Sequence, residues 1–262
     1  MQRRLWAAVV VAMLALAAVG SLTLGHSQEK AAHRGVHEAA ANDAGLDDVT
    51  AFAVLPPSEI ARRAKIEMKA LKAVHYRGFM VVGGDKMALT GGVDGQRHCQ
   101  IRLGAVGAAM RVRRVSDAYF VRFDREVLIE HPELMGKSGR ASESLIEILS
   151  GKWWKAPVDS VPEFRGMCSL HSHKSFVGAI VKSLSLTTVR GDVARVAGRM
   201  AVALVPTQGY GELWVAATGK HRVVRASDGV GNDSIDVVLA GFDRPVKVTV
   251  PPYRMIPGFA TV

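Results

Sequence analysis

Few residues of this chain are arranged in a way that could support chemistry. His171-Ser172-His173 places two imidazoles two positions apart, where they diverge on a helix and converge only on a strand or loop. No obvious carboxylate partner completes a ligand set. The sequence holds no phosphate-binding glycine loop, no nucleophile elbow and no HExxH motif. We therefore expect no catalytic residue, no metal ion and no cofactor, and the sequence favours a protein that is not an enzyme.

Two other segments could be interpreted as ligand-binding sites, but each can also be explained by a structural role. The stretch from Asp228 to Asp233 resembles half of a calcium loop but lacks the closing Glu, so a turn built from Asp, Gly and Asn is the better interpretation. The adjacent indoles of Trp153 and Trp154 fit a ligand platform, a contact with a membrane interface, or ordinary burial where a helix meets a sheet. The sequence leaves these three open.

Cys99 and Cys168 are the two cysteines of the chain, and neither belongs to a pair spaced for metal binding. In an oxidising compartment they could form a disulfide, which would stabilise the fold by about 4 kcal/mol through the long loop it closes. The alternative is that they are two unrelated small apolar residues.

The first 25 residues predict export across a membrane. Arg3 and Arg4 precede an apolar stretch from Leu5 to Leu24, which is long enough to span a bilayer. Positive charge before the stretch keeps the N-terminus inside, so the rest of the chain is expected outside the cytoplasm. Cleavage after Gly25 would release a secreted or periplasmic protein. Without cleavage, the stretch remains as a membrane anchor in the cell envelope.

The net charge of the chain limits the classes of partner that it is expected to bind. The formal net charge is +10, which suits anionic lipid headgroups, cell-wall polymers or nucleic acid, or is simply a solvated basic surface. The basic residues are scattered, without a long run or a recognition motif, so we expect no nucleic acid partner.

The remaining sequence predicts a tether followed by one domain. Residues 26–57 lack periodicity and suit a flexible tether. Residues 58–262 form the domain, which opens with an amphipathic helix marked by Ile60, Ala64 and Met68.

Two groups of short strands, separated by helices over about 127–186, follow that helix. Alternating apolar and basic residues, as in Ile101-Arg102-Leu103, indicate strands with one dry and one wet face. The first group covers 74–82, 86–90, 99–103, 110–113 and 118–123. The second covers 193–196, 200–205, 212–216, 221–226, 234–239 and 246–250. The predicted class is α+β, with a large curved antiparallel sheet covered on one face by helices.

Several segments together resemble a known family. They are Met68–Gly78, Gly151–Pro157, Gly211–His221, Ile235–Val237 and Phe242–Val246, followed by Pro251-Pro252. In order and spacing they are similar to the actinobacterial cell-envelope lipoproteins of the LppX/LprG type, relatives in fold of the LolA and LolB lipoprotein carriers. The resemblance covers about residues 58–252. It departs from the family where a lipobox cysteine is expected, because His26 follows Leu24-Gly25.

The resemblance implies a half-barrel of about ten or eleven antiparallel strands with helices on its concave face. An apolar cavity between sheet and helices would then hold acyl chains of a lipid or lipoprotein. The candidate cavity walls are Met68, Leu71, Phe79, Leu103, Tyr119, Val121, Leu145, Leu149, Phe176, Ile180, Leu184, Leu204 and Trp214.

The function expected on this basis is that of an extracytoplasmic lipid-binding or carrier protein, working as a monomer. A dry pocket suits this role, because exposing an acyl chain to water costs about 0.8 kcal/mol per CH₂. The alternative is a non-enzymatic interaction or sensing domain of the cell envelope, with a closed core and no ligand cavity.

Overall fold

A computed structural model describes residues 44–82, 84–104, 108–130, 143–156, 162–172, 175–186, 188–207, 211–230 and 233–255. The apolar stretch at 5–24 and most of the predicted tether lie outside these residues. No helix within the described ranges is long and apolar enough to cross a membrane.

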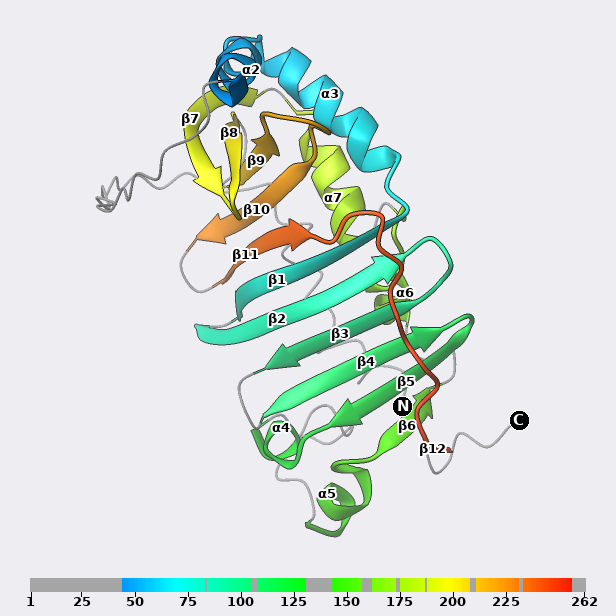
Figure 1. Cartoon of the computed structure of the whole chain (residues 1–262). Helices are drawn as coiled ribbons and strands as arrows, with labels where there is room; N and C mark the ends of the chain where they lie inside the picture. The colour runs from blue at the N-terminus through cyan, green and yellow to red at the C-terminus, as the bar shows by residue number, and fades with distance from the viewer. Residues whose placement is uncertain are drawn as a thin grey trace.

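A single sheet of twelve strands dominates the fold (Figure 1). Its strand order is β12-β6-β5-β4-β3-β2-β1-β11-β10-β9-β8-β7, so β1 and β11 join the two groups of strands that the sequence separates. All neighbours are antiparallel except β12 and β6. The strands are β1 (Ala73–Val82), β2 (Asp85–Asp94), β3 (Cys99–Gly104), β4 (Ala109–Val115), β5 (Ala118–Phe123), β6 (Trp153–Ala156), β7 (Thr188–Val196), β8 (Arg199–Pro206), β9 (Glu212–Ala216), β10 (Val223–Val230), β11 (Asp233–Ala240) and β12 (Tyr253–Met255).

The helices of the described residues are short. They are α2 (Ala44–Ala53), α3 (Pro57–Lys69), α4 (Arg125–Glu130), α5 (Glu143–Leu149), α6 (Pro162–Met167) and α7 (Phe176–Ser183). In Figure 1, α6 and α7 lie behind the sheet and α3 runs along its upper part, while α4 and α5 lie beyond its lower end. The predicted class, α+β with a large curved antiparallel sheet, is confirmed.

Three predicted boundaries need correction. The sheet has twelve strands rather than ten or eleven, because Trp153–Ala156 and Tyr253–Met255 add two. The strand predicted at 246–250 is absent. Part of the predicted tether is the helix α2, whose Val49 and Phe52 are buried in the core, with the Phe52 ring stacked on His221 at 4.0 Å.

The register of the strands gives the sheet an apolar face, which we call the inner face. Tyr76, Gly91, Ile101, Val112 and Val121 lie directly opposite one another on five neighbouring strands. Side chains alternate between the two faces of a strand, so the residues between them point to the opposite, outer face. The rings of Tyr76 and of Phe176 in α7 lie 5.7 Å apart, which places α7 over the inner face.

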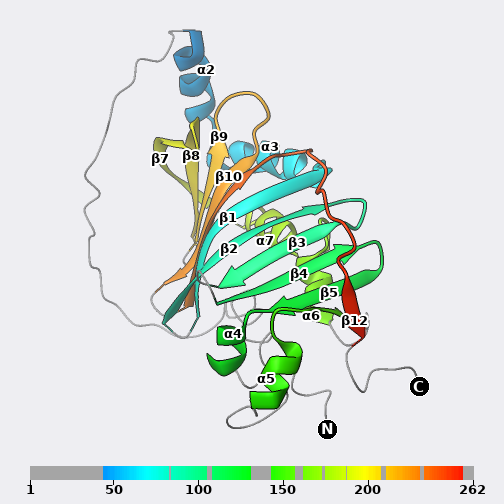
Figure 2. The same cartoon turned by 60° about the horizontal axis from the view of Figure 1, so that its bottom comes forward.

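The segment 241–252, which we call the strap, leads from β11 past the ends of the central strands to β12 (Figure 2). Asp243 accepts hydrogen bonds from the Lys72 N–H at 3.0 Å and from the Arg222 guanidinium at 2.6 Å. Farther along, the Val246 N–H donates to Asp94 at 3.2 Å. Side chains therefore hold the strap, which explains why its alternating valines form no strand.

Replacing Asp94 by alanine is expected to destabilise the fold by about 2–3 kcal/mol, because buried N–H groups would lose their acceptor. Asp94 is 4% exposed, and its carboxylate accepts from the N–H groups of Gln96 and His98 as well as from Val246. Urea unfolding measures the loss, and hydrogen exchange at Val246 should rise. Asp117→Ala is the control, because the Asp117 ion pair with Arg97 is exposed and worth less than about 1 kcal/mol. Equal losses in the two variants would contradict this role of Asp94.

Candidate functional site

The apolar layer between the inner face and the helices is the candidate site. The structure brings ten of the predicted wall residues into or against one buried cluster, and Leu149 of α5 is one of them. Most of them are at most 4% exposed, so water is excluded from the layer. The others are Met68, Leu71, Leu103, Tyr119, Val121, Ile180, Leu184 and Leu204, with the half-buried Phe176 packed against them.

Helix α7 is fixed over the layer by its first turn. Ser175 is the N-cap, and its hydroxyl accepts a hydrogen bond from the Gly178 N–H at 2.9 Å. The same hydroxyl lies 2.6 Å from the Ser172 carbonyl oxygen, to which it can donate. Ser175 is only 2% exposed, so these bonds satisfy a buried polar group and set the position of Phe176.

Helix α6 is tied to the sheet covalently. The Sγ atoms of Cys99 in β3 and Cys168, just after α6, are 2.07 Å apart and form a disulfide. Arg114 adds a hydrogen bond to the Cys168 carbonyl oxygen at 3.0 Å. Both cysteines are fully buried.

Phe79 and Trp214 were predicted in the cavity wall but lie on the outer face. Phe79 is flanked by Gly78 and Met80, which face inward, so its ring points the other way and lies 3.9 Å from the Lys86 ammonium. Trp214 lies in a second, smaller cluster, and its indole N–H donates to Glu212 at 2.6 Å. Both were named as candidate walls on the basis of the family resemblance, without a strand register, whereas alternation along the strand decides the face.

Helix α5 contributes fewer residues to the apolar layer than predicted. Leu149 packs against the main cluster, but Leu145 is only half-buried and is not part of it. The buried residue of this helix is Ile146, which the sequence analysis did not select. The carbonyl oxygen of Leu149 accepts a hydrogen bond from the Trp154 indole N–H at 3.0 Å, which places the end of α5 next to β6.

Residues that the sequence analysis did not select complete the inner wall. Met80, Val112 and Phe123 belong to the main cluster. The alternation with arginine in Met110-Arg111-Val112 and Val121-Arg122-Phe123 could have identified the last two, whereas Met80 lies in an unbroken apolar run. Burial raises the pKa of the Tyr76 phenol. Its ring lies over Gly91, where a Cβ would be 2.6 Å from the phenol oxygen, so glycine there makes room for Tyr76.

One polar group inside the layer has no partner. The Tyr119 hydroxyl is buried and makes no hydrogen bond with any described residue. Burial also raises the pKa of this phenol, so the hydroxyl is a protonated donor. A buried donor without an acceptor costs free energy and is a site where a ligand oxygen could bind.

Two hollows stand out in the described part of the molecule, and neither is lined by a residue of α3 or α7. One of about 310 Å³ is lined by Thr90, Gln100 and several arginines, and it also touches the strands at Tyr76, Gly91, Ile101 and Val112. The other, of about 420 Å³, lies beside the start of the strap at Lys220 and Arg222. Helices α3 and α7 bury apolar side chains in the same cluster as the residues of the inner face, so they pack against that face.

The other candidate residues do not form a site. Among the described residues no three metal-binding side chains cluster. His171 is exposed, and His173 lies outside the described residues. The two indoles of β6 diverge, because Trp154 is buried on the inner face whereas Trp153 is half-buried on the outer face under the Arg113 guanidinium.

The fold and the site define an α+β protein with an open antiparallel sheet, one face of which is apolar and covered by short helices. No family model and no curated protein matches this sequence. Solved structures similar to it include the following three. LprF from Mycobacterium bovis is 12% identical, with 74% of this chain and 96% of that chain covered and a TM-score of 0.48.

The lipoprotein LppX from Mycobacterium tuberculosis is 14% identical, with 74% of this chain and 98% of that chain covered and a TM-score of 0.41. The MucA/MucB complex of Pseudomonas aeruginosa is similar at 13% identity, with 71% of this chain and 55% of that chain covered and a TM-score of 0.31. LppX, after which the family that the sequence resembles is named, is one of the similar structures.

Proposed function

We propose that this chain is an extracytoplasmic lipid-binding protein that receives acyl chains between its inner face and the helices. The observation that carries the proposal is an apolar row that runs across nine neighbouring strands of the inner face. Each member lies directly opposite the next, and none carries a polar side chain. The row is Leu204, Leu213, Ala226, Val237, Gly78, Leu89, Leu103, Met110 and Phe123.

The dimensions of this row suit a long hydrocarbon chain. Neighbouring strands lie about 4.8 Å apart, so the row extends over about 38 Å. Each CH₂ taken out of water contributes about 0.8 kcal/mol, so an acyl chain can offset the cost of moving short helices away from the sheet. The helices α3 and α7 bury only apolar side chains in the cluster, and such contacts can be replaced by a hydrocarbon chain.

The Tyr119 hydroxyl supplies the polar contact that a lipid needs within an apolar site. Its oxygen has no partner among the described residues, and the Arg114 guanidinium lies 5.3 Å from its ring. In a complex, the hydroxyl would donate to an ester carbonyl of the lipid. This contact would fix the depth to which the acyl chain enters.

The same proposal assigns roles to the parts of the chain. Residues 58–262 form the lipid-binding unit. Helix α2 adds the buried side chains of Val49 and Phe52 to its core. Residues 1–25 act as an export signal or an anchor and keep the unit at the cell envelope. The lipid-binding unit works as a monomer.

A second candidate is an envelope interaction domain without a ligand cavity. The observation that favours it is the close contact between the helices and the inner face, because Met68, Leu204 and Val237 are fully buried without any ligand. The two candidates differ in whether this layer opens.

The test is to purify residues 44–262 from a lipid-containing host, extract them with organic solvent and quantify the lipid by mass spectrometry. We expect near-stoichiometric lipid, and uptake of a fluorescent fatty acid after delipidation. Phe176→Asp should weaken that uptake at least about tenfold, because a carboxylate would have to be desolvated in the layer. The matched control is Ile148→Asp, since Ile148 is 45% exposed on α5.

The two candidates predict different outcomes. A clean extract, together with no fatty-acid uptake by the unmodified protein, would favour the interaction domain. Equal uptake by the two aspartate variants would show that the fatty acid binds somewhere other than the layer beneath α7.

A further inference from the structure

The outer face of the sheet carries a row of arginines that is not visible in the sequence. Arg77, Thr90, Arg102, Arg111 and Arg122 lie directly opposite one another on β1 to β5. Neighbouring strands are about 4.8 Å apart, so like charges on adjacent strands repel and destabilise the sheet. A row of this kind is stabilised when an anion lies across it.

Carboxylates of the described residues neutralise only part of this charge. Arg111 pairs with Asp124 at 2.5 Å. Burial raises the pKa of Asp124, but hydrogen bonds from Arg111 and from the Ala109 N–H outweigh it, so the pKa lies below its ordinary value and the carboxylate stays charged. Arg77 and Arg102 have no ion-pair partner in the described part of the chain, and the Nε of Arg122 is buried without an acceptor there.

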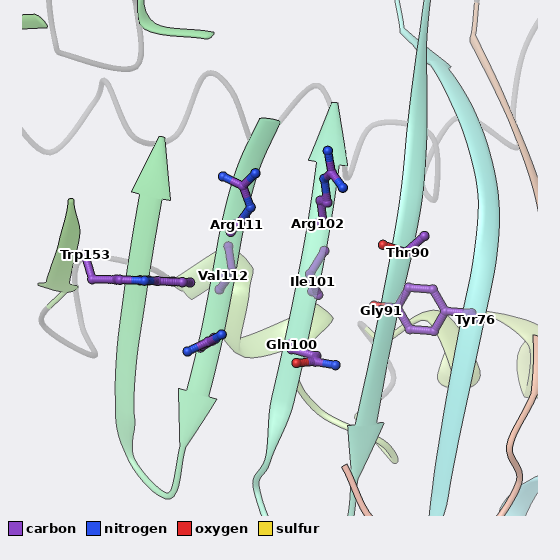
Figure 3. A pocket seen from close by; sticks show the side chains of 10 residues that line it. Tyr76, Thr90, Gly91, Gln100, Ile101, Arg102, Arg111, Val112 and Trp153 are labelled. Carbon is purple, nitrogen blue, oxygen red and sulfur yellow. The ribbon is translucent and has the colours of Figure 1, made fainter. Parts of the chain in front are cut away.

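A pocket of about 310 Å³ opens beside this row (Figure 3). Its polar groups are the guanidinium groups of three arginines, the Thr90 hydroxyl and the Gln100 amide, and one of its walls is an indole. The Arg113 guanidinium lies 4.6 Å from the centre of the Trp153 ring, which holds it in a fixed orientation. The polar and indole lining is Thr90, Gln100, Arg102, Arg111, Arg113 and Trp153.

We propose that this pocket binds a phosphate ester. Guanidinium groups bind phosphate oxygens through pairs of parallel hydrogen bonds, and hydroxyl and amide groups can supply further donors. The indole offers an apolar surface to the organic part of the ligand. The volume is at the lower end of that of small-molecule sites, which suits a headgroup or a sugar phosphate.

The arginines of this site point away from the inner face, and the pocket also touches the strands at Tyr76, Gly91, Ile101 and Val112, whose side chains belong to that face. Two classes of molecule carry such a phosphate ester. It could be the headgroup of a membrane lipid, or a soluble molecule of the cell envelope. The binding chemistry is the same for both.

The test measures binding to the full chain in an uncharged detergent by calorimetry. The probes are sn-glycerol 3-phosphate and phosphatidylglycerol in mixed micelles, with phosphatidylcholine micelles for comparison. We expect Arg102→Gln and Arg113→Gln to weaken binding at least about tenfold. Arg77→Gln is the matched control, because it removes the same charge from the row without lining the pocket, and should change binding by less than about threefold. Thermal unfolding checks that each variant folds.

Each outcome decides the proposal. Arginine-dependent binding of glycerol phosphate supports a soluble ligand, and arginine-dependent binding of phosphatidylglycerol alone supports a lipid headgroup. No binding of either probe overturns the proposal. An equal loss in Arg77→Gln and Arg102→Gln also overturns it, because the effect would then be one of diffuse charge. Phe176→Asp should leave phosphate binding unchanged, so failure of the lipid proposal would be seen separately.

Discussion

Replacing both Cys99 and Cys168 by alanine is expected to lower the free energy of unfolding by about 4 kcal/mol. The two residues are 69 positions apart, and a cross-link over a loop of this length removes a large part of the conformational entropy of the unfolded chain. The loop contains β4, β5, β6 and the helices α4 to α6, so the bond joins the end of the helical segment to β3.

Urea unfolding of the oxidised protein and of the double variant measures this difference. Chemical reduction of the unmodified protein should produce a similar loss, and free thiols should be absent from the unreduced chain by mass spectrometry. A double variant within about 1 kcal/mol of the unmodified protein would contradict the expected constraint. Fatty-acid exchange is an additional readout, because the released α6 would move away from β3 more easily.

The sequence predicted the inner wall best where alternation is strict. In β3 the order of Ile101, Arg102 and Leu103 assigns each side chain to a face, and the register then places the inward ones in one layer. The prediction failed where candidate walls were named from the resemblance without following the alternation along the strand. Phe79 and Trp214 are large and apolar, but each stands at an outward position of its strand.

Other parts of the fold depend on partners that are distant in sequence. The valines at 246, 248 and 250 alternate like those of a strand, but the Val246 N–H is bound by Asp94, 152 residues away. The helix α2 lies in a stretch without clear periodicity and is held by Phe52 against His221. Local sequence patterns cannot predict contacts between residues so far apart in the chain.

The arginine row shows the same dependence on register. Arg77, Arg102, Arg111 and Arg122 are scattered in the sequence, so the sequence leaves open whether the net charge attracts anionic partners or forms a solvated basic surface. Pairing of β1 to β5 brings them to the same level of the sheet. A one-residue shift of any strand would move its arginine to the inner face, so the strand register that builds the apolar layer also builds the basic pocket.

Substituting Gly78 by alanine is expected to destabilise the fold by about 3 kcal/mol, and valine should cost more. A Cβ at this position would lie 2.0 Å from the carbonyl oxygen of Asp236 and 2.7 Å from the Cα of Val237. Both are backbone atoms of β11, so relief requires a shift of the strand rather than of a side chain. The affected pair, β1 with β11, joins the two halves of the sheet.

Gly95→Ala is the matched control, because the nearest atom to its Cβ would be the Lys72 carbonyl oxygen at 3.7 Å, an ordinary contact. This variant should lie within about 1 kcal/mol of the unmodified protein in urea unfolding, since alanine also restricts the unfolded chain. Gly78 is a member of the apolar row as well, so Gly78→Ala should weaken fatty-acid binding more than Gly95→Ala. Equal stability of the two variants would contradict the close approach of β1 and β11, and with it the continuity of the apolar row on which the proposed lipid binding depends.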